Sequence, residues 1–206
     1  PRTQLSYGPI LTPTRQYGML NGRCIGGCAY RDKQGNVFIF AGTIRNLFML
    51  KAGLSTWQNV AQSPGAYNSG DDVWQFVIFN GKIIATNYQN VPQIMTLAGG
   101  TAFADLAGSP PRGKYIAVVK NAFVVFGNTY DSTNAEMPQR VWWSGAGQPE
   151  NYPALGTQAA AEVQSGAVDL LGPAGEVQGF APDLINADAV VFLEHGVRRM
   201  MYVGPP

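Results

Sequence analysis

The chain has 206 residues, of which 46% are hydrophobic and only 13% are charged, with 25 glycines and 14 prolines. Disordered chains are rich in charge and poor in aromatic residues, so this composition excludes disorder and favours many short strands and turns. The formal net charge is +1 and no basic run is longer than Arg198-Arg199, so nothing indicates a protein that grips nucleic acid or an anionic membrane.

Residues 1–22 show neither a helical nor a strand period, and we expect them to form an extended arm. Their apolar side chains are too numerous for a free tail, so the arm is expected to pack on something. The chain begins at Pro1 and not at Met, which indicates a processed or truncated start. No window approaches the ~18 continuous apolar residues of a membrane-spanning helix, and we expect no membrane anchor.

Cys24 and Cys28 follow the arm. On one extended strand they would lie about 13 Å apart, which is too far for a disulfide, although a tight turn at Gly26-Gly27 could bring them together. Two cysteines cannot complete a structural zinc site by themselves. We expect two ordinary small buried residues and no metal.

From residue 23 onward the pattern repeats as strand, turn, strand, strand and a short last strand. The second unit contains Asn80-Gly81 between two apolar runs, which is the strongest short signal for a β-hairpin. A short helix of a turn or two is predicted within residues 156–165. The expected units are residues 24–60, 73–108, 114–156 and 175–204.

The spacing of the units predicts the fold. Val37, Ile83 and Phe123 begin equivalent second strands at steps of 46 and 40 residues, and Val190 follows 67 residues later. Four strands in ~40–45 residues are typical of a propeller blade. We therefore predict an all-β protein with one propeller-type domain of about four blades at 23–206, and an insertion near 157–173 between the third and fourth blades.

The fourth unit ends at its third strand, "RRMMYVG". A propeller typically needs 4–8 blades to close. We therefore expect an incomplete, open propeller whose unpaired edge meets more polypeptide, another copy or a partner protein.

Two adjacent tryptophans, Trp142 and Trp143, lie in the third strand of the third unit, "QRVWWS". Neighbouring residues of a strand point to opposite faces, so each tryptophan is expected to face a different neighbouring blade. Trp57 and Trp74 are assigned to blade packing in the same way. Three arginines lie on equivalent third strands beside aromatic residues, and two roles stay open for them: packing within the blade or contact between subunits. They are Arg140, Arg198 and Arg199.

The sequence gives little support for a catalytic role. The single histidine, His195, lies in a hairpin turn and cannot by itself assemble a triad or a metal cluster. No carboxylate spacing favours a glycosidase pair, and no glycine-rich phosphate motif is present. We expect no enzyme, no catalytic residue and no cofactor. Five aspartates are expected at turns: Asp105, Asp131, Asp169, Asp183 and Asp188.

The stretches "VWQFVIFNGKIIATNYQNVPQIMTL", "PPRGKYIAVV", "QRVWWSGAGQPENY" and "LEHGVRRMMYVG", in this order, resemble the propeller-forming tail proteins of short-tailed bacteriophages and related prophages. The likeness covers most of residues 24–204. It implies a structural virion protein: a hub or nozzle in the phage tail, built as a ring of identical propeller subunits. Its partners would be portal-adaptor or other tail proteins, with DNA only as passing cargo. Members usually continue beyond "RRMMYVG", so the resemblance implies either a fragment of a longer protein or an unusually short member.

A second class stays open, namely a carbohydrate- or receptor-binding propeller. In that class exposed aromatic rings stack on sugars, and the candidates in this sequence are Tyr88, Tyr130 and Tyr152.

Overall fold

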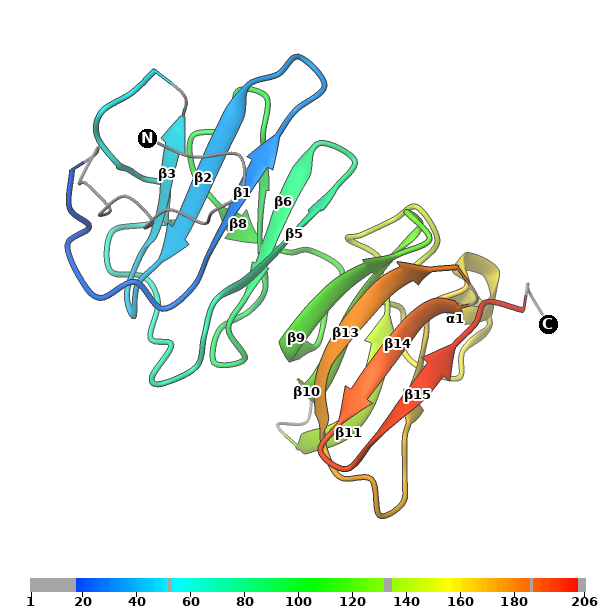
Figure 1. Cartoon of the computed structure of the whole chain (residues 1–206). Helices are drawn as coiled ribbons and strands as arrows, with labels where there is room; N and C mark the ends of the chain where they lie inside the picture. Colours follow the sequence, from blue (N-terminus) through cyan, green and yellow to red (C-terminus); the bar gives the residue numbers. More distant parts are fainter. Residues whose placement is uncertain (1–17, 52, 132–134, 186, 204–206) are drawn as a thin grey trace, which may run out of the picture.

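The computed structural model describes residues 18–51, 53–131, 135–185 and 187–203. The strands in these residues form four small antiparallel sheets, and the sheets are arranged as the four blades of a β-propeller (Figure 1). The predicted all-β propeller fold is thereby confirmed. Most of the predicted arm, residues 1–17, lies outside the described residues.

Each of the first two blades has four strands in chain order, as the repeat predicts. Blade 1 contains β1 (Gly27–Arg31), β2 (Val37–Gly42), β3 (Leu47–Lys51) and β4 (Gln58–Asn59). Blade 2 contains β5 (Gln75–Phe79), β6 (Lys82–Thr86), β7 (Gln93–Thr96) and β8 (Ala104–Asp105). The last strand is short in both blades.

The third blade differs from the prediction in its last strand. It contains β9 (Arg112–Val119), β10 (Phe123–Tyr130), β11 (Glu136–Trp143) and β12 (Gly166–Asp169). We had expected this blade to end at residue 156 and an insertion to follow it near 157–173. Instead, residues 144–165 lie between β11 and β12, so the extra residues are inside blade 3. The predicted short helix is found there as α1 (Gln158–Val163), capped by the side chain of Thr157.

The fourth blade has three strands within the described residues: β13 (Val177–Leu184), β14 (Ala187–Leu193) and β15 (Gly196–Met200). They pair in the order β13-β14-β15, so β15 has a strand partner on one side only. Arg198 and Arg199 lie on this strand, and Arg140 lies on β11. All three arginines are therefore on third strands, as predicted.

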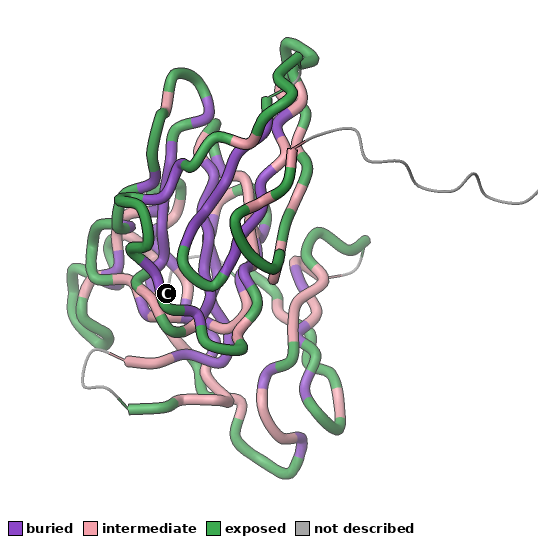
Figure 2. The backbone as a smooth tube through the Cα atoms, turned by 90° about the vertical axis from the view of Figure 1, so that its left-hand side faces the viewer, coloured by how far each residue is buried: buried purple, intermediate pink, exposed green. Residues whose placement is uncertain are grey.

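Three apolar cores fill the spaces between successive blades. One joins blades 1 and 2 around Phe40 and Trp74, the next joins blades 2 and 3 around Ile84 and Phe126, and the third joins blades 3 and 4 around Val125. Figure 2 shows that many of the buried residues, in purple, lie along neighbouring inner strands. Among the described residues, no apolar core joins blade 4 back to blade 1. These two blades lie at opposite ends of the series of four blades (Figure 1). The propeller is therefore open.

The adjacent tryptophans face different cores, as their alternation predicts. Trp142 is buried in the core between blades 2 and 3, whereas Trp143 is half-buried and packs against the core between blades 3 and 4. Trp74 is buried between blades 1 and 2, and its indole N–H donates to the carbonyl oxygen of Thr43 at 2.9 Å. Trp57 is half-buried and lines a shallow hollow with Ile39 and Ala41, on the face of blade 1 that points away from blade 2.

The Asn80-Gly81 hairpin forms as predicted. Phe79 pairs with Lys82, and the two turn residues have φ values of 47° and 75°. Nothing lies within 4 Å of a Cβ atom placed on Gly81, so a substitution there acts through the backbone alone. We expect Gly81→Val to lower the free energy of unfolding by about 1–2 kcal/mol, because a β-branched residue resists positive φ.

Chemical denaturation of Gly81→Val measures this effect. Gly81→Asn is the matched control, because asparagine tolerates the left-handed conformation, and we expect it to be close to the wild type. Equal stability of the valine and asparagine variants would contradict the positive φ of Gly81 in this hairpin.

Candidate interaction site

The open end of the propeller contains an apolar cavity of about 500 Å³ between blades 3 and 4. Its wall on the blade 3 side includes Phe123, Trp143 and Val168, and its wall on the blade 4 side includes Val191 and Met200. Arg198 and Arg199 also line it, so charged groups stand beside an otherwise apolar surface. An apolar hollow with a few convergent polar groups is the usual form of a binding site.

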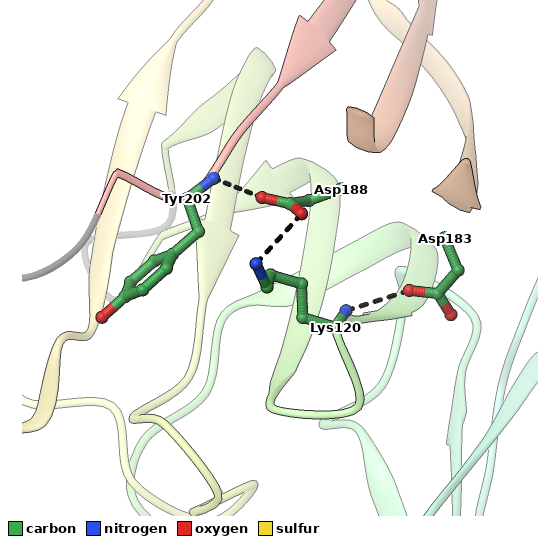
Figure 3. Close-up of polar contacts among 4 residues, drawn as sticks. All are labelled: Lys120, Asp183, Asp188 and Tyr202. Atoms are coloured by element: carbon green, nitrogen blue, oxygen red, sulfur yellow. Dashed lines mark hydrogen bonds and ion pairs between the residues drawn. The ribbon is translucent and has the colours of Figure 1, made fainter. Parts of the chain in front are cut away.

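Tyr202 holds the residues after β15 against blade 3 (Figure 3). Its backbone N–H donates to the carboxylate of Asp188. Its hydroxyl donates to Oε1 of Gln164 at 2.6 Å. The Tyr202 ring packs on Phe123 at 5.5 Å between centroids, with the Lys120 ammonium 5.6 Å from the Tyr202 ring. Because Tyr202 also lines the cavity, this tyrosine closes part of it.

Asp188 and Asp183 connect blade 4 to the turn of blade 3 around Lys120. The Lys120 ammonium lies 3.3 Å from Oδ1 of Asp188, and the Lys120 backbone N–H donates to Oδ1 of Asp183 at 3.1 Å (Figure 3). The hydrogen bond from the Tyr202 N–H, followed by that from Lys120, lowers the pKa of Asp188. These contacts fix the position of blade 4 relative to blade 3.

The outer face of blade 4 exposes apolar side chains. Phe192 and Val197 are paired across β14 and β15, point away from blade 3, and are 43% and 57% exposed. The corresponding outward positions of the other blades, such as Ile84 and Val125, are fully buried by the next blade. Contiguous exposed apolar residues of this kind mark interaction surfaces.

A polar pair joins the third and fourth strands of blades 2 and 3. In blade 2, Gln93 faces Asp105 in the β7–β8 register, and its Nε2 donates to Oδ1 of Asp105 at 2.6 Å. In blade 3, Arg140 faces Asp169 across β11 and β12 and donates from Nε and Nη2 at 2.7 and 2.9 Å. We had expected these aspartates at turns, but both lie on strands because their side chains accept from the neighbouring strand.

The remaining three aspartates that were expected at turns differ in their positions. Asp183 and Asp188 are also strand residues, on β13 and β14. Asp131 alone follows a strand, and its backbone N–H donates to the carbonyl oxygen of Ala135 at 3.0 Å.

The Arg140–Asp169 pair predicts a pH dependence. The hydrogen bonds from Arg140 lower the pKa of Asp169. A carboxyl group with a lower pKa in the folded state stabilises the fold above its unfolded pKa of about 4, and this stabilisation is lost as the pH falls through the folded pKa. Because the pair is partly exposed, we expect Asp169→Asn to cost up to about 1 kcal/mol at pH 7 and almost nothing at pH 2.

Urea denaturation of Asp169→Asn and wild type at pH 7 and pH 2 measures this difference. The matched control is Asp71→Asn, which changes a carboxylate in an exposed turn. A stability gap between Asp169→Asn and wild type that stays the same at both pH values would show that the charge of Asp169 has no such role.

The three predicted interface arginines therefore have different environments. Arg140 is engaged inside its own blade by Asp169, which corresponds to the packing role. Arg198 and Arg199 are exposed, and in the described part of the chain neither forms a salt bridge. Only these two arginines remain available for contact with another chain.

A sequence signal for the fourth strands was missed in the sequence analysis. In each of the three fourth strands, an apolar residue is followed by one residue of any type, then by Asn or Asp, and then by Val or Leu. A proline comes four or five residues after the Asn or Asp. The Val or Leu packs toward the next blade in each case. The three copies are "WQNVAQSP" at 57–64, "FADLAGSP" at 103–110 and "AVDLLGP" at 167–173.

The proposed sugar-stacking tyrosines do not form a common platform. Tyr152 is buried against Phe126 with ring centroids 6.0 Å apart. Tyr130 and Tyr88 are half-buried and meet edge to face at 6.0 Å, and the Arg112 guanidinium lies 3.9 Å from the Tyr130 ring centre. One face of Tyr130 is therefore already covered by protein.

The other candidate groups do not converge. His195 is exposed in the β14–β15 turn. Cys24 and Cys28 are free thiols, and Cys24 is exposed, so our expectation that both are buried was wrong for Cys24. Burial raises the pKa of Cys28 to about 11. Among the described residues, no three His, Cys, Asp or Glu side chains are grouped to hold a metal, and no helix has the length and apolar character to span a membrane.

Comparisons with known proteins do not assign the chain. No protein-family model matches it, and no curated protein matches it significantly. The class of protein that the fold defines is a β-propeller, with an apolar cavity beside the third strand of its fourth blade.

Proposed function

We propose that this protein is a structural component of a bacteriophage tail, a hub or nozzle subunit that assembles with copies of itself around the path of the DNA. The observation that carries the proposal is the outer face of blade 4, where Phe192 and Val197 are exposed beside an edge of β15 that no described strand pairs with. An exposed edge and apolar face of this kind favour association with another chain.

Two further observations support the proposal. The order of motifs resembles the propeller-forming tail proteins, and the net charge of +1 suits a protein that surrounds DNA without gripping it. The partners are other copies of the chain and neighbouring tail proteins such as a portal adaptor, and the protein resides in the virion. The role is assembly and not catalysis.

The carbohydrate-binding alternative has less support. Of its three tyrosines, Tyr152 is buried and Tyr130 is stacked with Arg112. A sugar would have to displace the guanidinium to reach that ring face.

Electron microscopy of the purified full chain, together with its mass in solution, tests the assembly role. We expect closed rings of identical subunits with a central channel, and detection of the chain by mass spectrometry in purified phage particles. A monomer at all concentrations, with specific retention on a glycan array, would favour the carbohydrate-binding class.

A further inference from the structure

Two Asn-Gly pairs of this chain stand in almost the same local sequence. Asn21-Gly22 lies in "LNGR" and Asn80-Gly81 lies in "FNGK", so each asparagine follows a large apolar residue and each glycine precedes a cation. Both asparagines and both glycines are exposed to solvent. Water and the neighbouring side chains therefore act on the two pairs alike, and a difference in their reactivity has to come from the backbone.

Asparagine is a chemically labile residue, and a following glycine exposes its side-chain amide to attack by the backbone. The backbone nitrogen of the glycine loses its proton to water or hydroxide and bonds to the asparagine Cγ, and the side-chain nitrogen takes up a proton and leaves as ammonia. Water then opens the resulting cyclic imide at one of its two carbonyl carbons. The product is aspartate, or isoaspartate, whose main chain runs through Cβ and Cγ. Glycine favours the first step because it has no Cβ to hinder the approach.

The hairpin of blade 2 holds Asn80 in a conformation that blocks the first step. Asn80 and Gly81 have φ values of 47° and 75°, and both are therefore left-handed, as in a two-residue hairpin turn. In this conformation the Gly81 nitrogen lies on the opposite side of the Asn80 Cα–C bond from Cβ, so it does not meet Cγ. The pairing of Phe79 with Lys82 and the hydrogen bond from the Leu97 N–H to the Gly81 carbonyl oxygen, at 2.9 Å, hold the turn in place.

The backbone around Asn21 has no such restraint. Asn21 and Gly22 form a bend outside the strands, and neither has a positive φ. Within the described part of the chain, no hydrogen bond engages the Gly22 backbone N–H or the Asn21 side-chain amide. The two groups that react are therefore free, and rotation about the Asn21 Cα–C bond brings them together.

We infer that Asn21 is a site of spontaneous modification, at which loss of the side-chain amide gives aspartate and isoaspartate, and that Asn80 is protected by its hairpin. The co-reactant is water, and ammonia is the leaving group. The reaction is independent of the proposed role in a phage tail.

The modified bend is compatible with the fold of blade 1. Two backbone hydrogen bonds enclose it, from the Gly18 N–H to the Ser55 carbonyl oxygen at 3.1 Å and from the Ile25 N–H to the Gly42 carbonyl oxygen at 2.9 Å. Residues 19–24 between these bonds belong to no strand, so the extra main-chain carbon of isoaspartate changes the bend and leaves the register of β1 as it is. Each event also adds one carboxylate, which changes the formal net charge from +1 to 0.

Peptide mapping of the full chain compares both sites in one sample. The protein is incubated at mildly alkaline pH in water enriched in heavy oxygen, and mass spectrometry follows the solvent oxygen that enters each peptide. We expect Asn21 to react at least about tenfold faster than Asn80, because reaction at Asn80 waits for the hairpin to open. Equal rates at the two sites in the folded protein, or a faster reaction at Asn80, would overturn the inference.

The same incubation in urea removes the structural difference between the two pairs. Because their local sequences are alike, we expect Asn21 and Asn80 to react at similar rates in the unfolded chain. If Asn80 stays slow in urea as well, the local sequence causes the difference, and the protective role of the hairpin is wrong.

Two variants test the chemistry at the reactive pair. In Gly22→Ala the added methyl group meets Thr43 at an ordinary distance of 3.6 Å but hinders the approach of the nitrogen, so we expect a folded protein that reacts more slowly. Asn21→Gln keeps a side-chain amide but needs a larger ring, so the more acidic band that the wild type develops on isoelectric focusing should not appear. The same band at the wild-type rate in both variants would place the modification at another residue and refute the assignment to Asn21.

Discussion

Trp142→Ala is expected to lower the free energy of unfolding by about 3–5 kcal/mol, because the truncation leaves a large cavity in the core between blades 2 and 3. Trp142 is 8% exposed and belongs to the same core as Ile84 and Phe126. Its indole nitrogen is buried without a hydrogen-bond partner, so the ring contributes by packing and not by a polar contact. Equilibrium denaturation in urea measures the loss.

Two control variants distinguish packing from binding. Trp142→Phe removes the unpaired N–H and keeps an aromatic ring, so we expect it to retain much of the stability. Trp143→Ala removes a half-buried ring that donates to the Gln164 carbonyl oxygen at 2.9 Å and lines the cavity, so we expect a smaller loss. A Trp142→Ala variant with an unchanged melting temperature that no longer assembles would contradict the packing role.

Gly42→Val is expected to lower the free energy of unfolding by about 3 kcal/mol, which is the upper end of the usual range for an overpacked core. A Cβ atom on Gly42 would lie 2.2 Å from Cδ1 and 2.4 Å from Cγ of Trp74. The Trp74 ring cannot move away easily, because it is 2% exposed, donates to the Thr43 carbonyl oxygen and packs on Tyr67 at 5.1 Å. The substitution therefore separates blade 1 from blade 2.

Thermal melting of Gly42→Val and of a matched glycine variant measures this effect. Gly22→Ala is the control, since its Cβ would meet Thr43 at an ordinary distance of 3.6 Å. Surface changes of that kind usually stay within about 0.5 kcal/mol. A Gly42→Val variant as stable as Gly22→Ala would mean that the two blades do not pack as closely as described.

The sequence predicted the fold well where local chemistry is strong. The Asn80-Gly81 turn, the opposite faces of Trp142 and Trp143, and the period of the second strands are encoded by neighbouring residues. The fourth strand of blade 3 was misplaced because β12 is short and follows residues 144–165. The position of β12 depends on its pairing with β11, where Asp169 contacts Arg140. A contact between residues so far apart in the chain is not visible in the local periodicity.

The candidate site was predicted only in part. The arginines of the third strands were identified, but the sequence could not distinguish Arg140, which is held by Asp169, from Arg198, which forms no salt bridge within the described part of the chain. The cavity between blades 3 and 4 depends on residues from both blades, such as Phe123 and Met200, and on the fold of Tyr202 back onto blade 3. Comparison of the fourth strands with one another, and not with other proteins, would have found β12.

Hydrogen exchange at β15 tests most directly whether the edge of blade 4 is an interface. Backbone amides of Gly196–Met200 that point away from β14 have no strand partner among the residues that the structure describes. We predict that in the full chain these amides exchange slowly at high protein concentration and rapidly on dilution, while the central strand β14 stays protected throughout. Rapid exchange of β15 at every concentration, with β14 protected, would contradict the assignment of this edge as the site where another copy binds.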